Sequence, residues 1–166
     1  MSNIQIKFAT KQDIPLILQF IKELAEYEKL AHEVVATEED LLKTLFGKRA
    51  YAEVILAYVE NKPVGFALFF HNYSTFLGKP GIYLEDLYVK PEARGQGIGQ
   101  ALLSYLAQLA KERDCGRLEW WVLDWNTPAI EFYKRIGAVP MDEWTVYRVT
   151  DEALDNLANN TTLKAL

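Results

Sequence analysis

The chain has 166 residues, half of them hydrophobic and a quarter charged, which is typical of one globular domain spanning 1–166. Its net charge of −5 argues against nucleic acid or an anionic membrane as a partner. Cys115 is the only cysteine, which excludes an internal disulfide and a cysteine-rich metal site, so we expect no metal.

The first part of the chain predicts one strand and two helices. Residues 3–9 alternate hydrophobic and polar side chains, as a half-buried strand does. A helix over 10–29 opens with a capping box between Thr10 and Asp13, and a second helix over 37–47 opens in the same way. The N-terminus has no signal-peptide pattern, so we expect a cytoplasmic protein.

The rest of the chain alternates strands and helices. Strands are expected where Val, Ile, Phe and Tyr are frequent, at 51–59, 63–72, 81–89, 118–125 and 144–150. A hairpin turn is expected at 60–63, a loop at 72–80, helices at 97–113, 128–136 and 151–157, and a fraying tail at 158–164. This order predicts a mixed α/β fold.

The most informative stretch follows the strand 81–89. Positions 94–100 read Arg-Gly-Gln-Gly-Ile-Gly-Gln and lead directly into a helix. Glycines let the backbone approach a ligand closely, and free N–H groups at a helix start attract anions. The stretch therefore predicts a phosphate or pyrophosphate site, with a tight ligand-free connection as the alternative. It lacks the Gly-Lys-Ser/Thr ending of a P-loop and the last glycine of the dinucleotide motif.

This stretch resembles the coenzyme-binding motif of the GNAT superfamily of N-acetyltransferases. Residues 124–138, Asp-Trp-Asn-Thr-Pro-Ala-Ile-Glu-Phe-Tyr-Lys-Arg-Ile-Gly-Ala, are similar to the family's closing segment. Segments 22–28, 83–86 and 132–135 are similar to the spermidine/spermine (diamine) N-acetyltransferase group. The resemblance implies a GNAT fold of the α/β (α+β) class. Its central sheet would be mixed, mostly antiparallel, V-splayed and flanked by helices, and the protein would be a homodimer.

The resemblance also implies the activity. It predicts transfer of an acetyl group from acetyl-coenzyme A to a primary amine of a small molecule, by direct attack in a ternary complex. The favoured acceptors are a polyamine or diamine, or a lysine- or thialysine-like amino acid. Two alternatives stay open: an acetyltransferase acting on protein N-termini or lysine side chains, and a non-catalytic coenzyme A-binding module.

Two residues are candidates for proton transfer. Glu85 lies in a strand flanked by Leu84 and Leu87, and burying a charged carboxylate among apolar residues costs free energy, so its presence there points to a function. The resemblance implies that it is the base, acting directly or through water; a salt-bridged or edge-facing glutamate is the alternative. Asp86 would point to the opposite face if the strand is regular, so only one of the pair would face the substrate, although a bulge here would change this. Tyr133 aligns with the family's catalytic tyrosine, which can protonate the leaving sulfur, although it could also be a packing residue.

Further site residues are implied by the resemblance. For the coenzyme they are Leu87, Tyr88, Val89, Arg94, Gly95, Gln96, Gly97, Ile98, Gly99, Gln100, Asn126, Pro128, Ala129 and Tyr133. The N–H of Leu87 would face the thioester oxygen, and Asn126 would bond the coenzyme arm if Thr127 caps the following helix. For the amine they are Tyr27, Glu28, Glu85, Glu119, Trp120 and Trp121, because carboxylates and aromatic faces suit ammonium groups. The two tryptophans could equally be core and surface residues.

Overall fold

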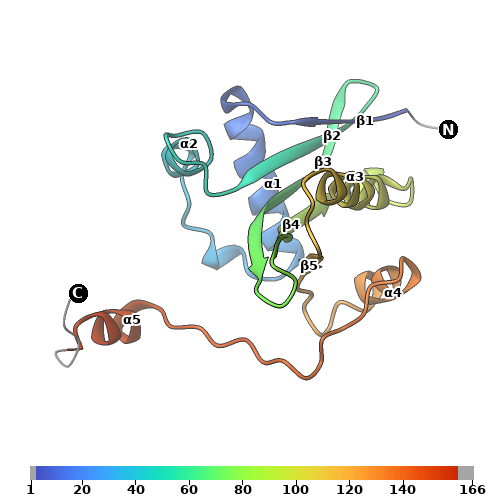
Figure 1. Ribbon diagram of the computed structural model, residues 1–166. Coiled ribbons are helices and arrows are strands. Elements are labelled where there is room, and N and C mark those ends of the chain that lie inside the picture. The colour runs from blue at the N-terminus through green and yellow to red at the C-terminus, as the bar shows by residue number, and fades with distance from the viewer. Residues whose placement is uncertain (1–2, 161–166) are drawn as a thin grey trace. The chain divides into compact units, whose positions relative to one another are not determined.

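Figure 1 shows the computed structural model, which describes residues 3–160. These residues form two compact units, one up to Leu123 and one from Asp124 on, and each is described by itself. The first unit holds a five-stranded sheet in the order β1-β2-β3-β4-β5. Its strands are β1 (Ile4–Phe8), β2 (Glu53–Val59), β3 (Lys62–Ser74), β4 (Lys79–Val89) and β5 (Leu118–Trp120). Only the β4–β5 pair is parallel, so the expected mixed, mostly antiparallel sheet is confirmed.

Helices cover both faces of this sheet. Helices α1 (Ile14–Tyr27) and α2 (Glu38–Leu45) lie behind it in Figure 1, and α3 (Ile98–Glu112) lies in front. Because side chains alternate between faces along a strand, neighbouring strand residues enter different core layers. The layer under α1 and α2 includes Ile17, Phe20, Leu56, Phe66 and Tyr88. On the strands, other fully buried side chains are Ile55, Phe69 and Ile82. Helix α3 contributes the fully buried side chains of Leu102 and Leu106.

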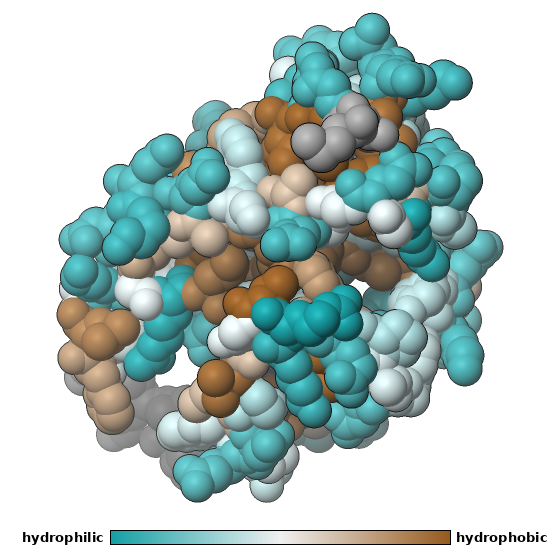
Figure 2. Space-filling model, turned by 90° about the vertical axis from the view of Figure 1, so that its right-hand side faces the viewer, coloured by the Kyte–Doolittle hydropathy of each residue, from teal (hydrophilic) through white to brown (hydrophobic). Residues whose placement is uncertain are grey.

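Hydrophilic residues dominate the face drawn in Figure 2, and hydrophobic side chains lie between them. Among the residues that the structure describes, no helix combines the length and apolar character needed to cross a membrane.

Local sequence signals explain how the first helices begin. The N–H of Thr10 donates to Asp13 Oδ2 at 2.8 Å, and the N–H of Thr37 donates to Asp40 Oδ2 at 2.9 Å. Both predicted capping boxes are therefore present. The first box opens a short 3₁₀ turn, η1 (Lys11–Asp13), and α1 follows directly. Two further 3₁₀ turns are η2 (Ala31–Glu33) and η3 (Pro91–Ala93).

Two hairpins connect the antiparallel strands β2, β3 and β4. The predicted turn between β2 and β3 is confirmed: Glu60 and Asn61 both have positive φ, as a two-residue hairpin turn requires. The predicted loop over 72–80 is confirmed only for residues 75–78, because β3 and β4 pair as far as Ser74 and Lys79. The polar residues there belong to a long hairpin, in which backbone pairing continues although the side chains are hydrophilic.

Up to residue 160, the second unit contains the helices α4 (Thr127–Arg135) and α5 (Asp151–Ala158), which confirms both predicted helices. Asn126, rather than Thr127, occupies the position that caps α4. The predicted strand 118–125 is present only as β5, and the predicted strand 144–150 is wrong. Alternation favours a strand only where another strand pairs with it. Of the expected fraying tail, residues 161–164 lie outside the described residues.

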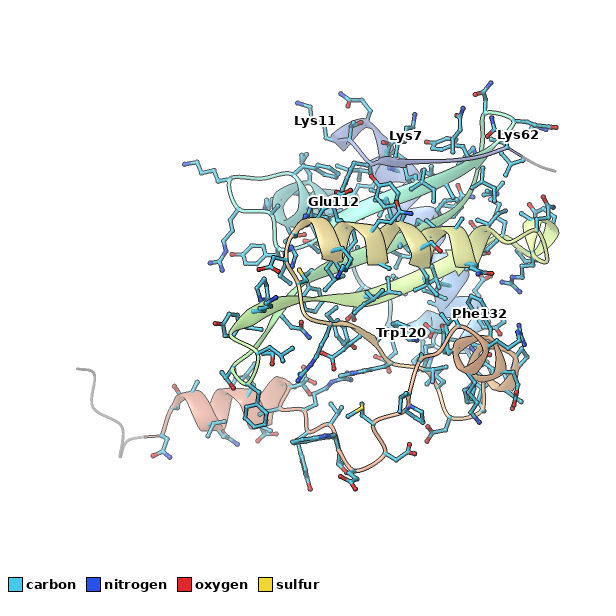
Figure 3. The ribbon with its side chains drawn as sticks, turned by 45° about the vertical axis from the view of Figure 1, so that its right-hand side comes forward. Lys7, Lys11, Lys62, Glu112, Trp120 and Phe132 are labelled. Carbon is cyan, nitrogen blue, oxygen red and sulfur yellow. The ribbon has the colours of Figure 1, made fainter. Side chains whose placement is uncertain are left out.

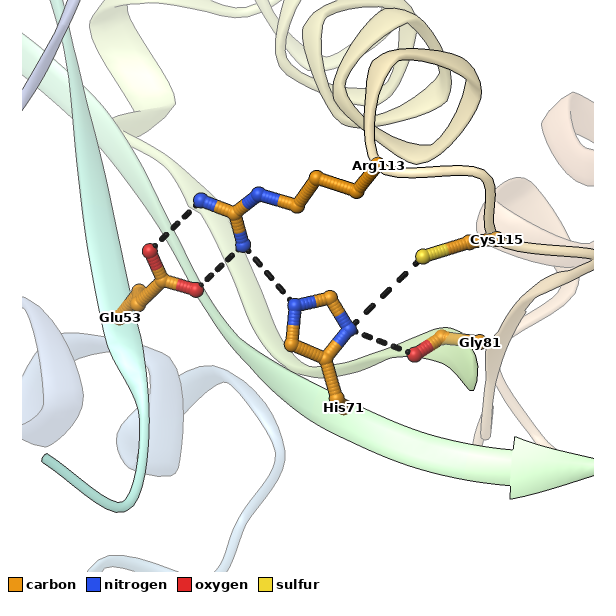
Figure 4. Close-up of polar contacts among 5 residues, drawn as sticks. All are labelled: Glu53, His71, Gly81, Arg113 and Cys115. Carbon is orange, nitrogen blue, oxygen red and sulfur yellow. Dashed lines mark hydrogen bonds and ion pairs between the residues drawn. The ribbon is translucent and has the colours of Figure 1, made fainter. Parts of the chain in front are cut away.

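A polar network ties the end of α3 to the sheet. Figure 3 shows α3 crossing the sheet, with Glu112 at its end, and Arg113 follows. Arg113 Nη1 and Nη2 donate to the Glu53 carboxylate at 2.6 and 2.9 Å, and Nη1 also lies 3.0 Å from His71 Nε2 (Figure 4). Because arginine can only donate, Nε2 accepts, so Nδ1 carries the proton and donates to the Gly81 carbonyl at 3.0 Å. The network therefore holds β3 against β4 at one level.

The surroundings of Cys115 bear on whether its thiol could act as a nucleophile. Its thiol lies at the same network, 3.8 Å from His71 Nδ1. Burial raises the pKa of this thiol, partly offset by the Arg113 charge, which lowers it. A raised pKa decreases the thiolate fraction at neutral pH, so the structure does not favour a nucleophilic role.

Candidate active site

The sheet opens between its two parallel strands. Strands β4 and β5 pair only from Ile82–Leu118 to Leu84–Trp120. Strand β5 ends at Trp120, whereas β4 continues to Val89. Among the described strands, none pairs with this edge of β4 beyond Leu84. A strand edge with unpaired N–H and C=O groups can bind an extended ligand in the manner of an added strand.

A β-bulge lies where this open edge begins. On β3 and β4, Leu68 faces Asp86 and Phe69 faces Leu84, so Glu85 has no residue opposite it. Strand β4 is therefore not regular at the acidic pair, and the expectation that Asp86 points away from Glu85 does not apply. The sequence pattern could not reveal this, because the extra residue is defined only by the pairing with β3.

The bulge also decides which backbone groups face the opening. The N–H of Ile82 donates to Arg117 on the β5 side at 3.0 Å, whereas the N–H of Lys90 donates to Val64 on the β3 side at 2.8 Å. Since N–H directions alternate along a strand, even-numbered residues face β5 before the bulge and β3 after it. The N–H groups of Leu87 and Val89 therefore point to the open edge, as the coenzyme prediction requires of Leu87.

Three carboxylates gather beside this edge: Glu28, Glu85 and Asp86. Burial raises the pKa of Asp86 to about 7, and the charges of Glu85 and then Glu28 add to the effect. Burial also raises the pKa of Glu28, with a further contribution from Glu85. Glu85 itself is exposed. Such a cluster attracts cations, and it contains a carboxyl group that exchanges its proton near neutral pH.

An aromatic group adjoins the carboxylates. The Tyr83 ring lies 5.0 Å from that of Phe70 and meets Trp121 edge-on at 5.8 Å. Tyr83 is also opposite Glu119 on β5. Burial raises the pKa of Tyr83, and the charges of Glu85, Glu119 and Asp86 raise it further. The structure thus brings the predicted residues Glu85, Glu119 and Trp121 to Tyr83, which sequence reasoning missed although it lies two positions before Glu85.

The other predicted acceptor residues have different positions. Trp120 is opposite Leu84 on β4, whereas Glu119 is opposite Tyr83, so the side chains of Trp120 and Glu119 lie on different faces of the sheet. Tyr27 ends α1, and the Arg94 guanidinium lies over its ring at 4.9 Å. Tyr27 therefore connects the carboxylate group, through Glu28, to the glycine loop.

The glycine loop has the properties of an anion site. Gly95 and Gly97 have φ of 79° and 80°, a conformation that favours glycine, and a Cβ on either would meet no atom within 4 Å. Gly97 caps α3, whose first turn contains no acidic residue. The N–H groups from Ile98 to Gln100 thus start a helix at an open loop, which suits a diphosphate.

The residues before this loop hold its shape. Arg94 Nε donates to the Val89 carbonyl at 3.0 Å, which closes the chain between strand and loop. The Tyr88 side chain is buried, and its hydroxyl donates to Glu23 Oε1 at 3.2 Å. The N–H of Tyr88 points to β3, so neither it nor the Tyr88 side chain faces the open edge, although Tyr88 is a predicted coenzyme residue.

The remaining predicted residues lie in the second unit. Asn126 caps α4, Pro128 and Ala129 are in its first turn, and the Tyr133 ring lies 5.6 Å from that of Phe132. Because this unit is described by itself, the roles of these four residues stay predictions.

The comparison with known proteins now decides the family. Residues 18–138 match the acetyltransferase (GNAT) family. The chain belongs to this family. It is 40% identical to thialysine N-epsilon-acetyltransferase of Bos taurus, over 95% of this chain and 99% of that protein. It is 33% identical to L-ornithine N5-acetyltransferase of Arabidopsis thaliana, over 90% of this chain and 86% of that protein.

A solved structure agrees with this assignment. An integron cassette protein from the mobile metagenome of V. cholerae superposes with a TM-score of 0.79 at 33% identity, covering 95% of this chain and 98% of that one. The predicted GNAT fold and family membership are therefore confirmed, and the chain is a GNAT N-acetyltransferase. The expectation that 1–166 form one domain stays a prediction.

The raised pKa of Asp86 predicts a pH-dependent cost to folding. The pKa lies above the usual value of 3.8, so ionisation is harder in the folded state. The cost is absent below about pH 4, where the group is protonated in both states, and is complete above about pH 7. We expect the free energy of unfolding of Asp86→Asn to be about 1–2 kcal/mol higher than that of wild type at pH 8. This difference in stability should vanish towards pH 4.

Urea unfolding at both pH values measures this difference. Asp142→Asn, at an exposed position of the second unit, is the matched control and should change neither value. An Asp86→Asn variant that is no more stable than wild type at pH 8 would contradict the raised pKa of Asp86.

Proposed function

We propose that this chain acetylates the primary amine of a small cationic acceptor, namely a diamine, a polyamine or a lysine-like amino acid. The observation that carries the proposal is the group of carboxylates and aromatic rings around Tyr83, next to the open edge of β4. Carboxylates and aromatic faces bind ammonium groups. The thialysine and ornithine acetyltransferases among its relatives have names that describe amine acceptors of this kind.

Acetyl-coenzyme A fits the residues that would hold it. It supplies the acetyl group as a thioester. The open backbone at Gly95 and Gly97, followed by the start of α3, suits its diphosphate. The N–H groups of Leu87 and Val89 at the open edge suit its extended arm. From the resemblance alone, we propose that Asn126, Pro128 and Ala129 also bind the coenzyme.

The acceptor must lose a proton, because a lysine-type amine is mostly protonated at neutral pH. We propose that Glu85 accepts this proton, directly or through water, and that Asp86 sets the pH at which the pair can do so. Glu85 is exposed beside the opening, and Asp86 has a pKa of about 7. An effective base has a pKa near the working pH. We further propose that Tyr133 donates a proton to the leaving sulfur.

A panel of amines tests the proposal. Purified protein is incubated with acetyl-coenzyme A and each acceptor, and released thiol is measured. The panel contains diamines, polyamines, lysine-like amino acids and short peptides with a free N-terminus. We expect thiol release with the small cationic amines. Release with peptides alone would favour the protein acetyltransferase, and no release with any amine would overturn the proposal.

We also propose that the protein is cytoplasmic and, from the resemblance to diamine acetyltransferases, that it is a homodimer. Light scattering should then give twice the 19.0 kDa mass of one chain. A monomer at micromolar concentration would contradict it.

A further inference from the structure

One side chain reaches across a whole strand of the sheet. Asn72 on β3 and Gly81 on β4 are directly opposite each other. A Cβ on Gly81 would lie 2.4 Å from Asn72 Oδ1, so the Asn72 amide occupies the space that a side chain at position 81 would fill. From there, Asn72 Nδ2 donates to Glu119 Oε1 on β5 at 3.2 Å. The missing side chain of Gly81 is what makes this contact possible.

Glu119 is held by this contact without being neutralised. In the described part of the chain, the ion pairs involve other residues, and the partner of Glu119 is a neutral amide. The side chain is partly buried, and its charge acts on Tyr83. An amide that binds one carboxylate oxygen fixes the orientation of the group and leaves the other oxygen for a cation.

The separation between Glu119 and the acidic pair Glu85 and Asp86 can be estimated along β4. Glu119 is opposite Tyr83, which precedes Asp86 by three positions on the same strand. Across β3, Phe70 faces Tyr83 and Leu68 faces Asp86, so the bulge leaves two residue steps between these levels, roughly 7 Å at about 3.3 Å per residue. The rings of Tyr83, Phe70 and Trp121 lie between or beside them and suit an alkyl chain.

We propose that Asn72 and Gly81 position Glu119 to bind a second ammonium group at the far end of the acceptor, so that the enzyme prefers a diamine to an amino acid. The inference rests on the proposed function, which places the reacting amine at Glu85 and Asp86. A lysine-like acceptor would bring its own carboxylate towards Glu119, and two like charges repel. A diamine or polyamine has no such group.

The neighbouring network makes this arrangement rigid. His71 donates to the Gly81 carbonyl and is itself held by Arg113, which binds Glu53 (Figure 4). The part of β3 and β4 that contains Asn72 and Gly81 is therefore anchored to the residue that follows α3. A positioning residue needs such support, because small displacements weaken a charge-assisted hydrogen bond.

The experiment compares three acceptors of equal length: an α,ω-diamine, the monoamine without the distal ammonium, and the amino acid with an added α-carboxylate. Each is assayed at saturating acetyl-coenzyme A. In wild type, we expect kcat/KM to be highest for the diamine. In Glu119→Gln, kcat/KM for the diamine should fall about tenfold, through KM with kcat retained, while the monoamine is unchanged.

Two variants then test the positioning role. Asn72→Leu and Gly81→Ala keep the Glu119 carboxylate but remove or displace the amide that orients it, so each should raise KM for the diamine alone, by about three- to tenfold. Glu112→Gln removes an exposed carboxylate at the end of α3 and is the matched control, with no change expected.

The outcomes separate this inference from the proposed function. A loss that is equal for diamine and monoamine means a merely structural role and overturns the inference. So does a wild-type enzyme that acetylates amines without regard to the distal charge. Failure to acetylate any amine overturns the proposed function instead. If Asn72→Leu does not fold, as circular dichroism would reveal, Gly81→Ala and Glu119→Gln still decide the matter.

Discussion

A Tyr133→Phe variant is expected to lose acetyl transfer, with kcat lower by about 10²–10³-fold. The substitution removes only the hydroxyl and leaves the ring beside Phe132. The leaving thiolate then loses its proposed proton donor, whereas the proposed backbone contacts to the coenzyme are unchanged. The affinity for coenzyme A, measured by calorimetry, should therefore stay within about twofold of wild type.

The control for this variant is Tyr147→Phe, at an exposed tyrosine of the same unit. It should keep both turnover and coenzyme affinity. If Tyr133→Phe keeps its full kcat, Tyr133 is a packing residue and the proton for the sulfur comes from elsewhere. If both kcat and coenzyme affinity collapse, the variant has disturbed α4, and the acid role is equally unsupported.

The second large effect is expected at the acidic pair. Glu85→Gln should lower kcat/KM by about 10²-fold, because it removes the proposed proton acceptor. In wild type, kcat/KM should rise with pH until about 7, since the group with that pKa must lose its proton. Removing the charge of Glu85 also removes a like charge beside Asp86, so what activity remains should rise at lower pH than in wild type.

The Asp86→Asn variant completes this comparison. It should abolish the part of the pH profile that depends on the carboxyl group with pKa of about 7. Using one acceptor throughout cancels the titration of the acceptor itself. A profile that is the same in all three proteins would mean that neither carboxylate governs proton transfer.

Much of the fold could be predicted because its signals are local. A capping box joins residues three positions apart, so Thr10 and Thr37 could be recognised without any knowledge of the fold. The glycine loop before α3 is equally local, since its positive φ angles depend on the residue type itself. The strand predicted at 144–150 failed because a strand also needs a partner, and alternation does not supply one.

The acidic and aromatic residues of the site were visible in the sequence, but their arrangement was not. Glu85, Glu119 and Trp121 could be named in advance, whereas Tyr83 and Asn72 could not. The role of Asn72 depends on Gly81 lying opposite it and on Glu119 lying one strand further on. Those residues are up to 47 positions apart in the sequence, so no local pattern connects them.

The amino-acid sequence by itself determined the family, the helices and the glycine loop before α3, since each depends on residues close together in the chain. Only the tertiary structure decided which groups face the opening beside β4. The bulge at Glu85 exists only relative to β3, and it reverses the direction of every following N–H group. The pKa of Asp86 likewise depends on burial and on Glu28, which α1 brings from the other end of the first unit. Pairing register and burial are properties of the packed chain, and they arise only when distant segments meet.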